Sequence, residues 1–454
     1  MTTNLSPTQT SAAGPLPMRS VVRTWWPLAA SWMLMSIEGP MMSAVVARLA
    51  YPEISLAAWG GVVWPLILVI ESPILMLLTA STALSKDWGS YRRLYGFMMW
   101  TCGLLTGLHV LIAFTPLYYI VVVDVIGAPA EIVEPARLGL QIILPWTWTI
   151  GYRRFHQGVM IRFGHSRAVG LGTLIRLSTD ALMLATGYLV GTIPGIAVAS
   201  GTIAAGVTSE AIYVGLRVRP VLRYQVRQVE PIEQPLTLVA FLTFYAPLAM
   251  TSALNMLTQP MGSAALSRMP RALDSLAAWS VVSGFVFFLR SLGVAFNEVV
   301  IALLDEPRST QSLRRFAIIL VAVMSATLLI VVATPLAPFW FGRVSALPPR
   351  LVTLSRRALW LALPMPGLTV LQSWYQGAIV HSRRTRGITE SLAAFLLTNS
   401  AILWAGVLWG QVAGLYVGLA GLTAGSIAQT AWLWIRSRPA MRSVQQGDMA
   451  PSAA

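Results

Sequence analysis

The sequence predicts an all-α integral membrane protein with about twelve transmembrane helices, built as two six-helix halves. Of its 454 residues 56% are hydrophobic and only 11% are charged, whereas a soluble domain has about 25% charged residues. The apolar residues form runs of roughly 20, the length at which a helix crosses the hydrocarbon core. The runs lack the alternation of barrel strands, so helices are expected to satisfy the backbone within the membrane. The third observation is an internal repeat, described below.

Twelve apolar segments follow one another along the chain, separated by short polar connections. Two further apolar pieces, 117–128 and 338–343, are interpreted as helix extensions or interfacial segments rather than as crossings. The predicted spans are residues 24–48, 57–83, 94–116, 136–161, 168–193, 195–217, 236–266, 277–303, 315–337, 356–380, 388–410 and 412–436. The predicted domains are a disordered cytoplasmic tail (1–23), an N-lobe (24–217), a cytoplasmic linker (218–235), a C-lobe (236–437) and a cytoplasmic tail (438–454).

The distribution of basic residues predicts the orientation. With the N-terminus in the cytoplasm, the inner tails and loops hold twenty of the 32 Lys and Arg residues, and the outer loops hold eight. An excess of basic residues in short loops marks the cytoplasmic side. Both termini are therefore expected in the cytoplasm, with the chain in a plasma membrane, most simply a bacterial inner membrane. The formal charge of +15 is explained by this bias and does not indicate nucleic-acid binding.

The two halves are related by duplication. Residues 26–59 align with 246–279 without a gap, with about 14 identities in 34 positions, including Arg48 with Arg268. The match returns at an offset of 219, where Leu144-Pro145 pairs with Leu363-Pro364. Each half holds six spans, so both halves have the same orientation and a substrate cavity is expected between them near the midplane. One chain is then expected to form a complete monomeric unit.

Ionisable side chains inside the predicted spans are the main functional candidates, because a charge in the hydrocarbon core is costly and by default marks function. The candidates for binding a coupling ion are Glu38, Glu71, Asp180 and Glu210. The candidates for lining a substrate cavity are Arg153, Arg154, Arg176, Arg290, Glu298, Asn399 and Gln429.

The repeat distinguishes the two halves. Asp180 corresponds to Asn399, Glu210 to Gln429 and Glu38 to Thr258. The second half keeps a polar group in each pair and drops the charge, which favours a proton- or cation-linked site in the N-lobe. An alternative is a structural ion pair between Arg176 and Asp180, which lie four residues apart and share a helix face.

Several other function classes find no support in the sequence. It has no H-E-x-x-H, G-x-S-x-G or P-loop motif, and one cysteine with four histidines offers no multi-cysteine metal site. The sequence therefore indicates neither an enzyme nor a resident metal or cofactor, apart from possible H⁺ or Na⁺ coupling.

The arrangement resembles the MATE-type fold of the multidrug/oligosaccharidyl-lipid/polysaccharide (MOP) exporter superfamily. The resemblance rests on Trp25-Trp26-Pro27-Leu28-Ala29, repeated as Ala246-Pro247-Leu248-Ala249, on the apolar segments after spans 3 and 9, and on the Gly- and Ala-patterned spans 6 and 12. The opening is also similar to the progressive-ankylosis branch, associated with anion export. The MATE resemblance implies alternating access between two lobes and cation-binding acids on spans 1 and 5, where Glu38 and Asp180 stand here. Arg176, one turn before Asp180, departs from that pattern.

These observations lead to three hypotheses. The first is a secondary transporter that exports a small organic solute, coupled to a proton or sodium gradient. The second is a translocator of an anionic substrate, such as pyrophosphate or an organic anion, or of a lipid-linked saccharide, because Arg suits phosphate and carboxylate recognition. The third is a membrane scaffold without transport.

Overall fold

The computed structural model describes residues 16–231, 236–304, 306, 309–382 and 386–449, and every regular element within them is helical. The all-α prediction is thus confirmed. Eight of the described helices are long and apolar enough to cross a membrane by length and composition. The other four predicted spans correspond to helices outside this set of eight. They are α1 (Met18–Ser36) with α2 (Glu38–Val46), α9 (Leu144–Arg162), α18 (Met365–His381) and α20 (Gly414–Met449).

The remaining elements follow the predicted order. In the first half they are α3 (Pro52–Ala58), η1 (Trp59–Val63), α4 (Trp64–Glu71), α5 (Leu77–Leu84), α6 (Trp88–Phe114), α7 (Leu117–Tyr119), η2 (Ile120–Ile126), α8 (Ala130–Ile142), α10 (Ser166–Val190), α11 (Gly195–Tyr224) and η3 (Val226–Gln228). In the second half they are α12 (Leu238–Met256), α13 (Thr258–Ser267), α14 (Ala272–Leu303), α15 (Ser309–Ala333), α16 (Leu336–Phe339), η4 (Trp340–Val344), α17 (Pro349–Leu359), η5 (Trp360–Ala362) and α19 (Arg386–Trp409).

Three predicted tail and linker boundaries differ from the structure. Helix α1 begins at Met18 rather than after residue 23, α11 continues to Tyr224 into the predicted linker, and α20 continues to Met449. Helices extend beyond the hydrocarbon core wherever the polar sequence keeps good helix formers, so hydropathy alone does not locate their ends. Residues 1–15 and 450–454 of the predicted tails and 232–235 of the linker lie outside the described residues.

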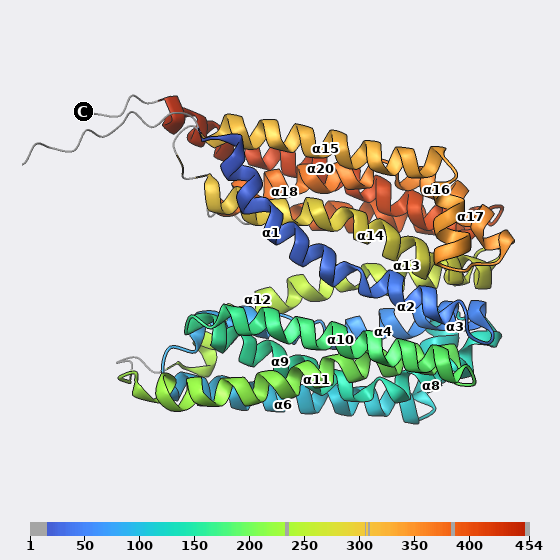
Figure 1. Cartoon of the computed structure of the whole chain (residues 1–454), viewed down its shortest axis with the longest axis horizontal. Coiled ribbons are helices and arrows are strands. Elements are labelled where there is room, and N and C mark those ends of the chain that lie inside the picture. The colour runs from blue at the N-terminus through green and yellow to red at the C-terminus, as the bar shows by residue number, and fades with distance from the viewer. Residues whose placement is uncertain (1–15, 232–235, 305, 307–308, 383–385, 450–454) are drawn as a thin grey trace, which may run out of the picture.

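The two halves form two helical bundles that meet at one end and diverge toward the end where α1 begins and α20 ends (Figure 1). We call the first the closed end and the second the terminal end. At the closed end α2, α3 and η1 lie beside α13 and α14.

The first helix of each half crosses to the opposite bundle. Trp25 of α1 donates its indole N–H to the carbonyl of Leu292 on α14 at 3.1 Å and packs edge-on against Phe316 of α15. In the same way Phe241 of α12 packs against Phe97 of α6, with ring centroids 4.4 Å apart. Connectivity therefore assigns α1 to the N-lobe, as the domain prediction did, whereas its packing joins it to the second half.

A break in each crossing helix permits this exchange. The first pair of helices breaks at Ile37 and the second pair at Leu257. Pro40 and Pro260 follow three residues later, and proline offers no N–H to the carbonyl four residues before it. Sequence duplication thus places the same bend in both halves, and α2 and α13 continue within their own bundles.

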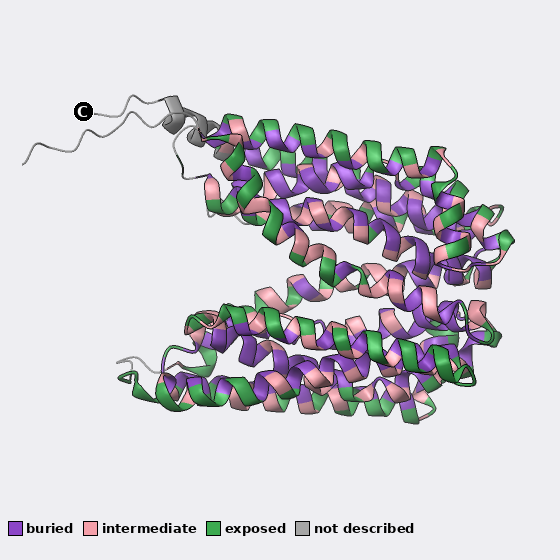
Figure 2. Ribbon diagram, in the orientation of Figure 1, coloured by how far each residue is buried: buried purple, intermediate pink, exposed green. Residues whose placement is uncertain are grey.

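The exposed surface of the bundles is largely apolar, as expected for helices that face lipid. Trp100, Leu189 and Leu397 are 82%, 81% and 73% exposed. Figure 2 shows such exposed residues along the outer helices, while buried residues concentrate inside each bundle and toward the closed end. In a soluble protein so many exposed large hydrophobic side chains would be a liability, and here they indicate contact with acyl chains.

The closed end is held by close helix packing and by two arginines that the repeat relates. A methyl group at Gly60 of η1 would lie 2.5 Å from the Cβ of Ser280 on α14, so the halves touch through backbone there. Arg48 of the first half donates to the carbonyls of Arg343 and Val344 in η4, at 2.6 and 2.7 Å.

Arg268, the repeat partner of Arg48, makes the reciprocal contact with the first half. It donates to the carbonyls of Ile126 and Val125 in η2, at 2.7 and 2.8 Å. These carbonyls end a helix and have no helical partner, which gives them partial negative charge. Each arginine therefore joins the two halves by charge-assisted hydrogen bonds.

Replacing both Arg48 and Arg268 with alanine is expected to loosen the closed end, because the five hydrogen bonds that they donate between the halves are lost. Spin labels at Thr192→Cys and Gln411→Cys lie in exposed connections of the two halves, and double electron–electron resonance measures the distance between them. Cys102→Ser removes the native cysteine first. The distance distribution should shift to longer values or broaden.

Arg137→Ala is the matched control. Arg137 also donates to a carbonyl, that of Ala113 at 3.1 Å, but both residues belong to the first half. An unchanged distribution in the Arg48→Ala, Arg268→Ala double variant, or an equal change in the control, would contradict the assignment of the two arginines to closure.

Candidate functional site

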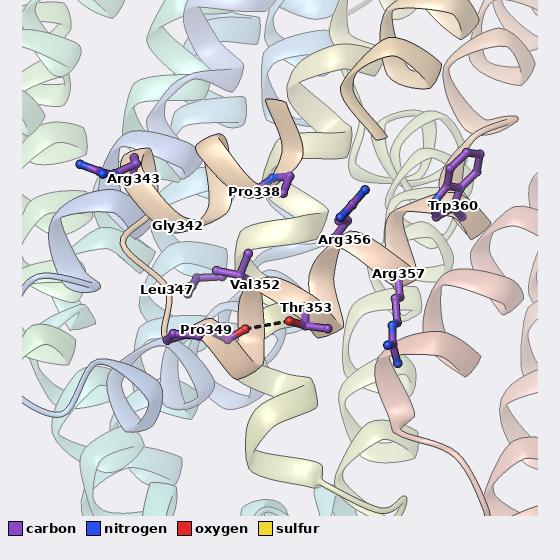
Figure 3. A pocket seen from close by; sticks show the side chains of 10 residues that line it. All are labelled: Pro338, Gly342, Arg343, Leu347, Pro349, Val352, Thr353, Arg356, Arg357 and Trp360. Carbon is purple, nitrogen blue, oxygen red and sulfur yellow. Dashed lines mark hydrogen bonds between the residues drawn. The ribbon is translucent and has the colours of Figure 1, made fainter. Parts of the chain in front are cut away.

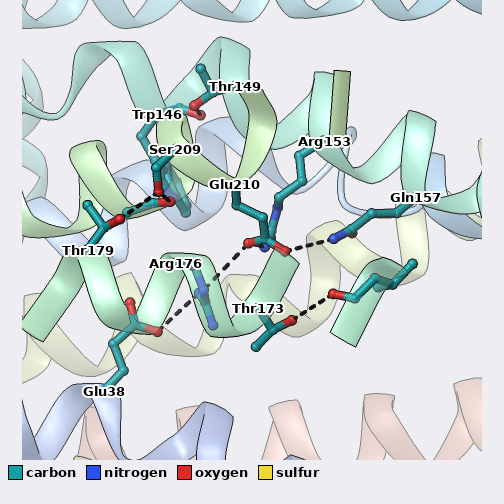
Figure 4. Close-up of polar contacts among 12 residues, drawn as sticks. Glu38, Trp146, Thr149, Arg153, Gln157, Thr173, Arg176, Thr179, Ser209 and Glu210 are labelled. Carbon is teal, nitrogen blue, oxygen red and sulfur yellow. Dashed lines mark hydrogen bonds and ion pairs between the residues drawn. The ribbon is translucent and has the colours of Figure 1, made fainter. Parts of the chain in front are cut away.

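A buried charged network lies inside the first half, where α9, α10 and α11 face the bend between α1 and α2 (Figure 4). Its members are Glu38, Arg153, Arg176 and Glu210, and we call these four residues the charged network. All four were candidates from the sequence, and the structure brings them together from four different helices.

Glu210 is the centre of the network and is fully buried. Arg153 on α9 donates to Glu210 Oε2, and Gln157 one turn later donates to Glu210 Oε1 at 2.8 Å. The Arg176 Nε lies 3.6 Å from Glu210 Oε2. In a low-dielectric interior such pairing offsets the large cost of removing each charge from water. Glu210 is thus held by several donors at once.

Glu38 is the peripheral acid of the network and the one that connects it to the bend. Its Oε2 lies 3.0 Å from Arg176 Nη1, and its side chain is 14% exposed. Glu38 is the first residue of α2, directly after the break at Ile37. One ion pair therefore joins the bend of the first span to α10.

The sequence left open a structural ion pair between Arg176 and Asp180, but among the described residues Arg176 pairs with Glu38 and Glu210 instead. Arg176 reaches across to Glu38 on α2 and Glu210 on α11, because its long side chain spans the gap between helices. The two carboxyl oxygens of Asp180 have no hydrogen-bond partner, although the residue is fully buried. A methyl at Gly206 of α11 would overlap Asp180 Oδ1 at 1.8 Å, so only glycine lets α11 pass so close.

Glu71 and Arg154 lie outside the charged network. Glu71 is fully buried on α4. Arg154 follows Arg153 on α9, and its Nε has no hydrogen-bond partner. No ion pair to Glu71 or Arg154 is formed within the part of the chain that the structure describes.

The equivalent region of the second half is neutral. By the offset of 219, Arg153 corresponds to Gln372, which donates to the carbonyl of Ser426 and to the Thr430 hydroxyl at 3.2 and 3.1 Å. The counterpart of Arg176 is Phe395, whose ring lies against Gly425.

The predicted neutral residues occupy the remaining equivalent places. Asn399 is buried with no hydrogen-bond partner for its amide, and Gln429 is half-buried on α20. The charged residues of the network thus have neutral counterparts throughout the equivalent region of the second half.

The other two candidates, Arg290 and Glu298, lie two turns apart on α14 of the second half. Arg290 donates from Nε to the Thr369 hydroxyl on α18 at 2.7 Å. Glu298 is exposed and accepts from the indole N–H of Trp32 on α1 at 3.2 Å. Among the described residues, neither side chain forms an ion pair with the charged network.

Sequence reasoning missed two polar contacts of these acids, Gln157 and Trp32. Gln157 had a signal, because Gln157-Gly158 recurs as Gln376-Gly377 in the repeat. Trp32 had none, since its contact with Glu298 depends on the crossing of α1 into the second bundle.

Glu210→Gln is expected to destabilise the protein strongly, because it leaves two buried guanidinium groups without their shared carboxylate. Breaking one partner of a buried ion pair costs about 3–5 kcal/mol. The double variant Arg153→Gln, Glu210→Gln copies the neutral pair Gln372 and Gln429 of the second half and should recover much of the loss. Thermal unfolding in detergent measures both. A single variant as stable as the wild type, or a double variant no better than the single, would refute this.

The fold is similar to solved transporter structures, while no family model and no curated protein matches the sequence. An inward-facing multidrug resistance MATE family transporter of the MOP superfamily superposes with a TM-score of 0.69 at 14% identity, covering 94% of this chain and 99% of that one. An outward-facing conformation of such a transporter gives 0.60 at 14% identity, with 95% and 97% covered.

A MOP superfamily transporter from Pyrococcus furiosus, described as having a binding pocket of reverse polarity, gives a TM-score of 0.59 at 15% identity, with 94% and 97% covered. The predicted resemblance to MATE transporters is confirmed for the fold, and the resemblance to the progressive-ankylosis branch stays a prediction. The chain therefore has a MATE-like fold, with about twelve spans in two halves.

Proposed function

We propose that the chain is a secondary active transporter that works by alternating access between its two halves, rather than an enzyme. The observation that supports this best is the ion pair between Glu38 and Arg176 at the bend where the first span leaves one bundle for the other. The transporter exports a small organic solute across a bacterial inner membrane as a monomer, with both termini in the cytoplasm.

The arrangement of the bundles supports an inward-open state. They meet at the closed end and diverge toward the terminal end, where α1 begins and α20 ends (Figure 1). The inward-facing MATE structure superposes better than the outward-facing one, with TM-scores of 0.69 and 0.60. In the return step the arginine contacts of the closed end must break, and the halves must approach at the terminal end.

The charged network suits a coupling role because its two acids have different numbers of partners. Glu210 has Arg153, Gln157 and Arg176 around it, whereas Glu38 has an ion pair to Arg176 alone. Neutralising Glu38 removes its pair with Arg176 and leaves the pair between Arg153 and Glu210 in place. Protonation of Glu38 would thus release the bend from α10 while the rest of the network stays paired.

The position of Arg176 favours a proton over sodium as the coupling ion. Its guanidinium group lies between the carboxylates of Glu38 and Glu210, where a bound cation would otherwise balance their charge. A metal ion there would meet a fixed positive charge. Asp180, whose oxygens are unpartnered, is the second acid available to a proton.

Glu38→Gln should abolish gradient-dependent efflux while leaving the protein folded, since the amide keeps the shape and loses the titratable charge. Ethidium efflux from bacteria that lack their main drug pumps measures transport. Glu390→Gln is the control, because Glu390 pairs with Arg386 and Arg436 outside the network. Efflux retained by Glu38→Gln would rule out Glu38 as the coupling acid.

An anionic substrate is the second candidate, supported by Arg290. Arg290 is half-buried, and its guanidinium group has one neutral partner, Thr369, and no ion pair among the described residues. A transporter of similar fold from Pyrococcus furiosus is described as having a binding pocket of reverse polarity. The polarity of the binding pocket therefore varies among proteins with this fold.

Under this alternative, Arg290→Gln weakens binding of citrate or pyrophosphate by about tenfold or more, the loss expected for one charge-assisted contact. Isothermal titration of the purified protein measures it. Arg271→Gln serves for comparison, because Arg271 is already paired with Asp274 at 2.9 Å. No binding of either anion to the wild type, or equal binding by Arg290→Gln, would exclude this candidate.

A further inference from the structure

The repeat supplies two copies of one segment at the closed end, and they differ in chemistry. The first copy is α7, η2 and α8, and the second is α16, η4 and α17. They align without a gap at an offset of 219, and Gly127 and Ala346, at equivalent positions, both have positive φ, +74° and +49°. The shared residues include Thr115, Pro116 and Leu117 with Thr334, Pro335 and Leu336, Pro129 with Pro348, and Arg137 with Arg356.

In the first copy the shared arginine is fully engaged. Arg137 donates from Nη1 to the Tyr119 hydroxyl at 2.9 Å and from Nε to the Ala113 carbonyl at 3.1 Å. Its guanidinium group lies 5.3 Å from the centre of the Tyr119 ring. The Tyr119 hydroxyl in turn donates to Glu134 at 2.8 Å. An aromatic ring and a carboxylate thus occupy the space beside the arginine.

In the second copy both of these partners are gone. Pro338 stands in place of Tyr119 and Thr353 in place of Glu134, and the Thr353 hydroxyl donates to the Pro349 carbonyl. The equivalent arginine, Arg356, lines a pocket of about 700 Å³ between α16, η4 and α17 (Figure 3). The pocket exists where the first half has its tyrosine and glutamate.

The second copy has also reversed its charge. Arg343 replaces Asp124 and Arg357 replaces Leu138, and both line the same pocket as Arg356. The three arginines are exposed, and none of them forms an ion pair within the described ranges. Arg350, on the same helix, is different, because it pairs with Glu53 and lies 3.5 Å from Asp274.

The surroundings of the pocket match a membrane interface. Helix α17 buries Leu351, Leu354 and Ala358 against the bundle and turns its arginines outward. Trp360, 47% exposed, lies on the pocket wall at the end of α17. Exposed tryptophan is typical of the headgroup level, where guanidinium groups can reach the phosphates of lipid headgroups.

We propose that this pocket binds a phosphate group, presented by an anionic phospholipid in the leaflet at the closed end. Arg356 and Arg357 donate to the phosphate oxygens, as guanidinium groups do in bidentate contacts. The apolar wall of Trp360, Leu347 and Val352 contacts the glycerol and the first carbons of the acyl chains. This site is independent of the charged network and of the transported substrate.

The test is native mass spectrometry of the full-length protein in neutral detergent, titrated with phosphatidylglycerol and, in parallel, with phosphatidylcholine. The wild type should retain phosphatidylglycerol in preference. Arg356→Gln with Arg357→Gln should weaken binding about tenfold or more. Arg350→Gln, outside the pocket, should bind as the wild type does.

A second variant fills the pocket without removing any arginine. Pro338→Tyr with Thr353→Glu restores the residues of the first half and should also lose the lipid, while thermal unfolding without lipid checks that both double variants are folded. A thermal shift with inorganic phosphate distinguishes the source of the ligand: stabilisation that requires the pocket arginines supports a free anion in place of a headgroup. No preference for phosphatidylglycerol together with no response to phosphate, or an equal loss in Arg350→Gln, would overturn the proposal.

Discussion

Arg176 is the residue on which the interior of the first half depends. Its guanidinium group stands between the carboxylates of Glu38 and Glu210, which come from α2 and α11. Without water, each of these charges is tolerable only when another offsets it. The packing of α9, α10, α11 and the bend of the first span is therefore tied to charge balance. A change in the charge of one acid changes the contacts of helices that also define the conformation.

The crossing of α1 and α12 gives this interaction a mechanical consequence. Helix α1 is anchored to the second bundle through Trp25, whereas α2 begins with Glu38 and lies in the first bundle. The bend between them is thus attached to both halves. At the closed end Arg48 and Arg268 attach the halves to each other through helix-terminal carbonyls. Movement of one half relative to the other must therefore change both the bend and these arginine contacts.

Much of the fold was predictable from the sequence, because hydropathy, basic residues and duplication each reflect a strong physical constraint. Apolar runs locate the spans, and the ungapped repeat predicted two equivalent halves. The charged candidates were identified from the cost of burying a charge. Their partners were not: Arg176 could pair with Asp180 by spacing alone, yet it pairs with Glu38, which is 138 positions earlier in the chain. Contacts between distant helices depend on tilt and crossing, which one sequence does not encode locally. The exchange of α1 between bundles was missed for the same reason.

The most direct test of the central claim is the separation of the halves at the terminal end as the charge of Glu38 changes. Spin labels at Leu216→Cys and Ile435→Cys, exposed repeat-related positions on α11 and α20, report this separation in lipid nanodiscs after Cys102→Ser. If the pair between Glu38 and Arg176 governs the bend, acidification redistributes the distances in the wild type, and Glu38→Gln shows the acid-like distribution at every pH. A wild type and a Glu38→Gln variant with the same distances and the same pH response would contradict the account.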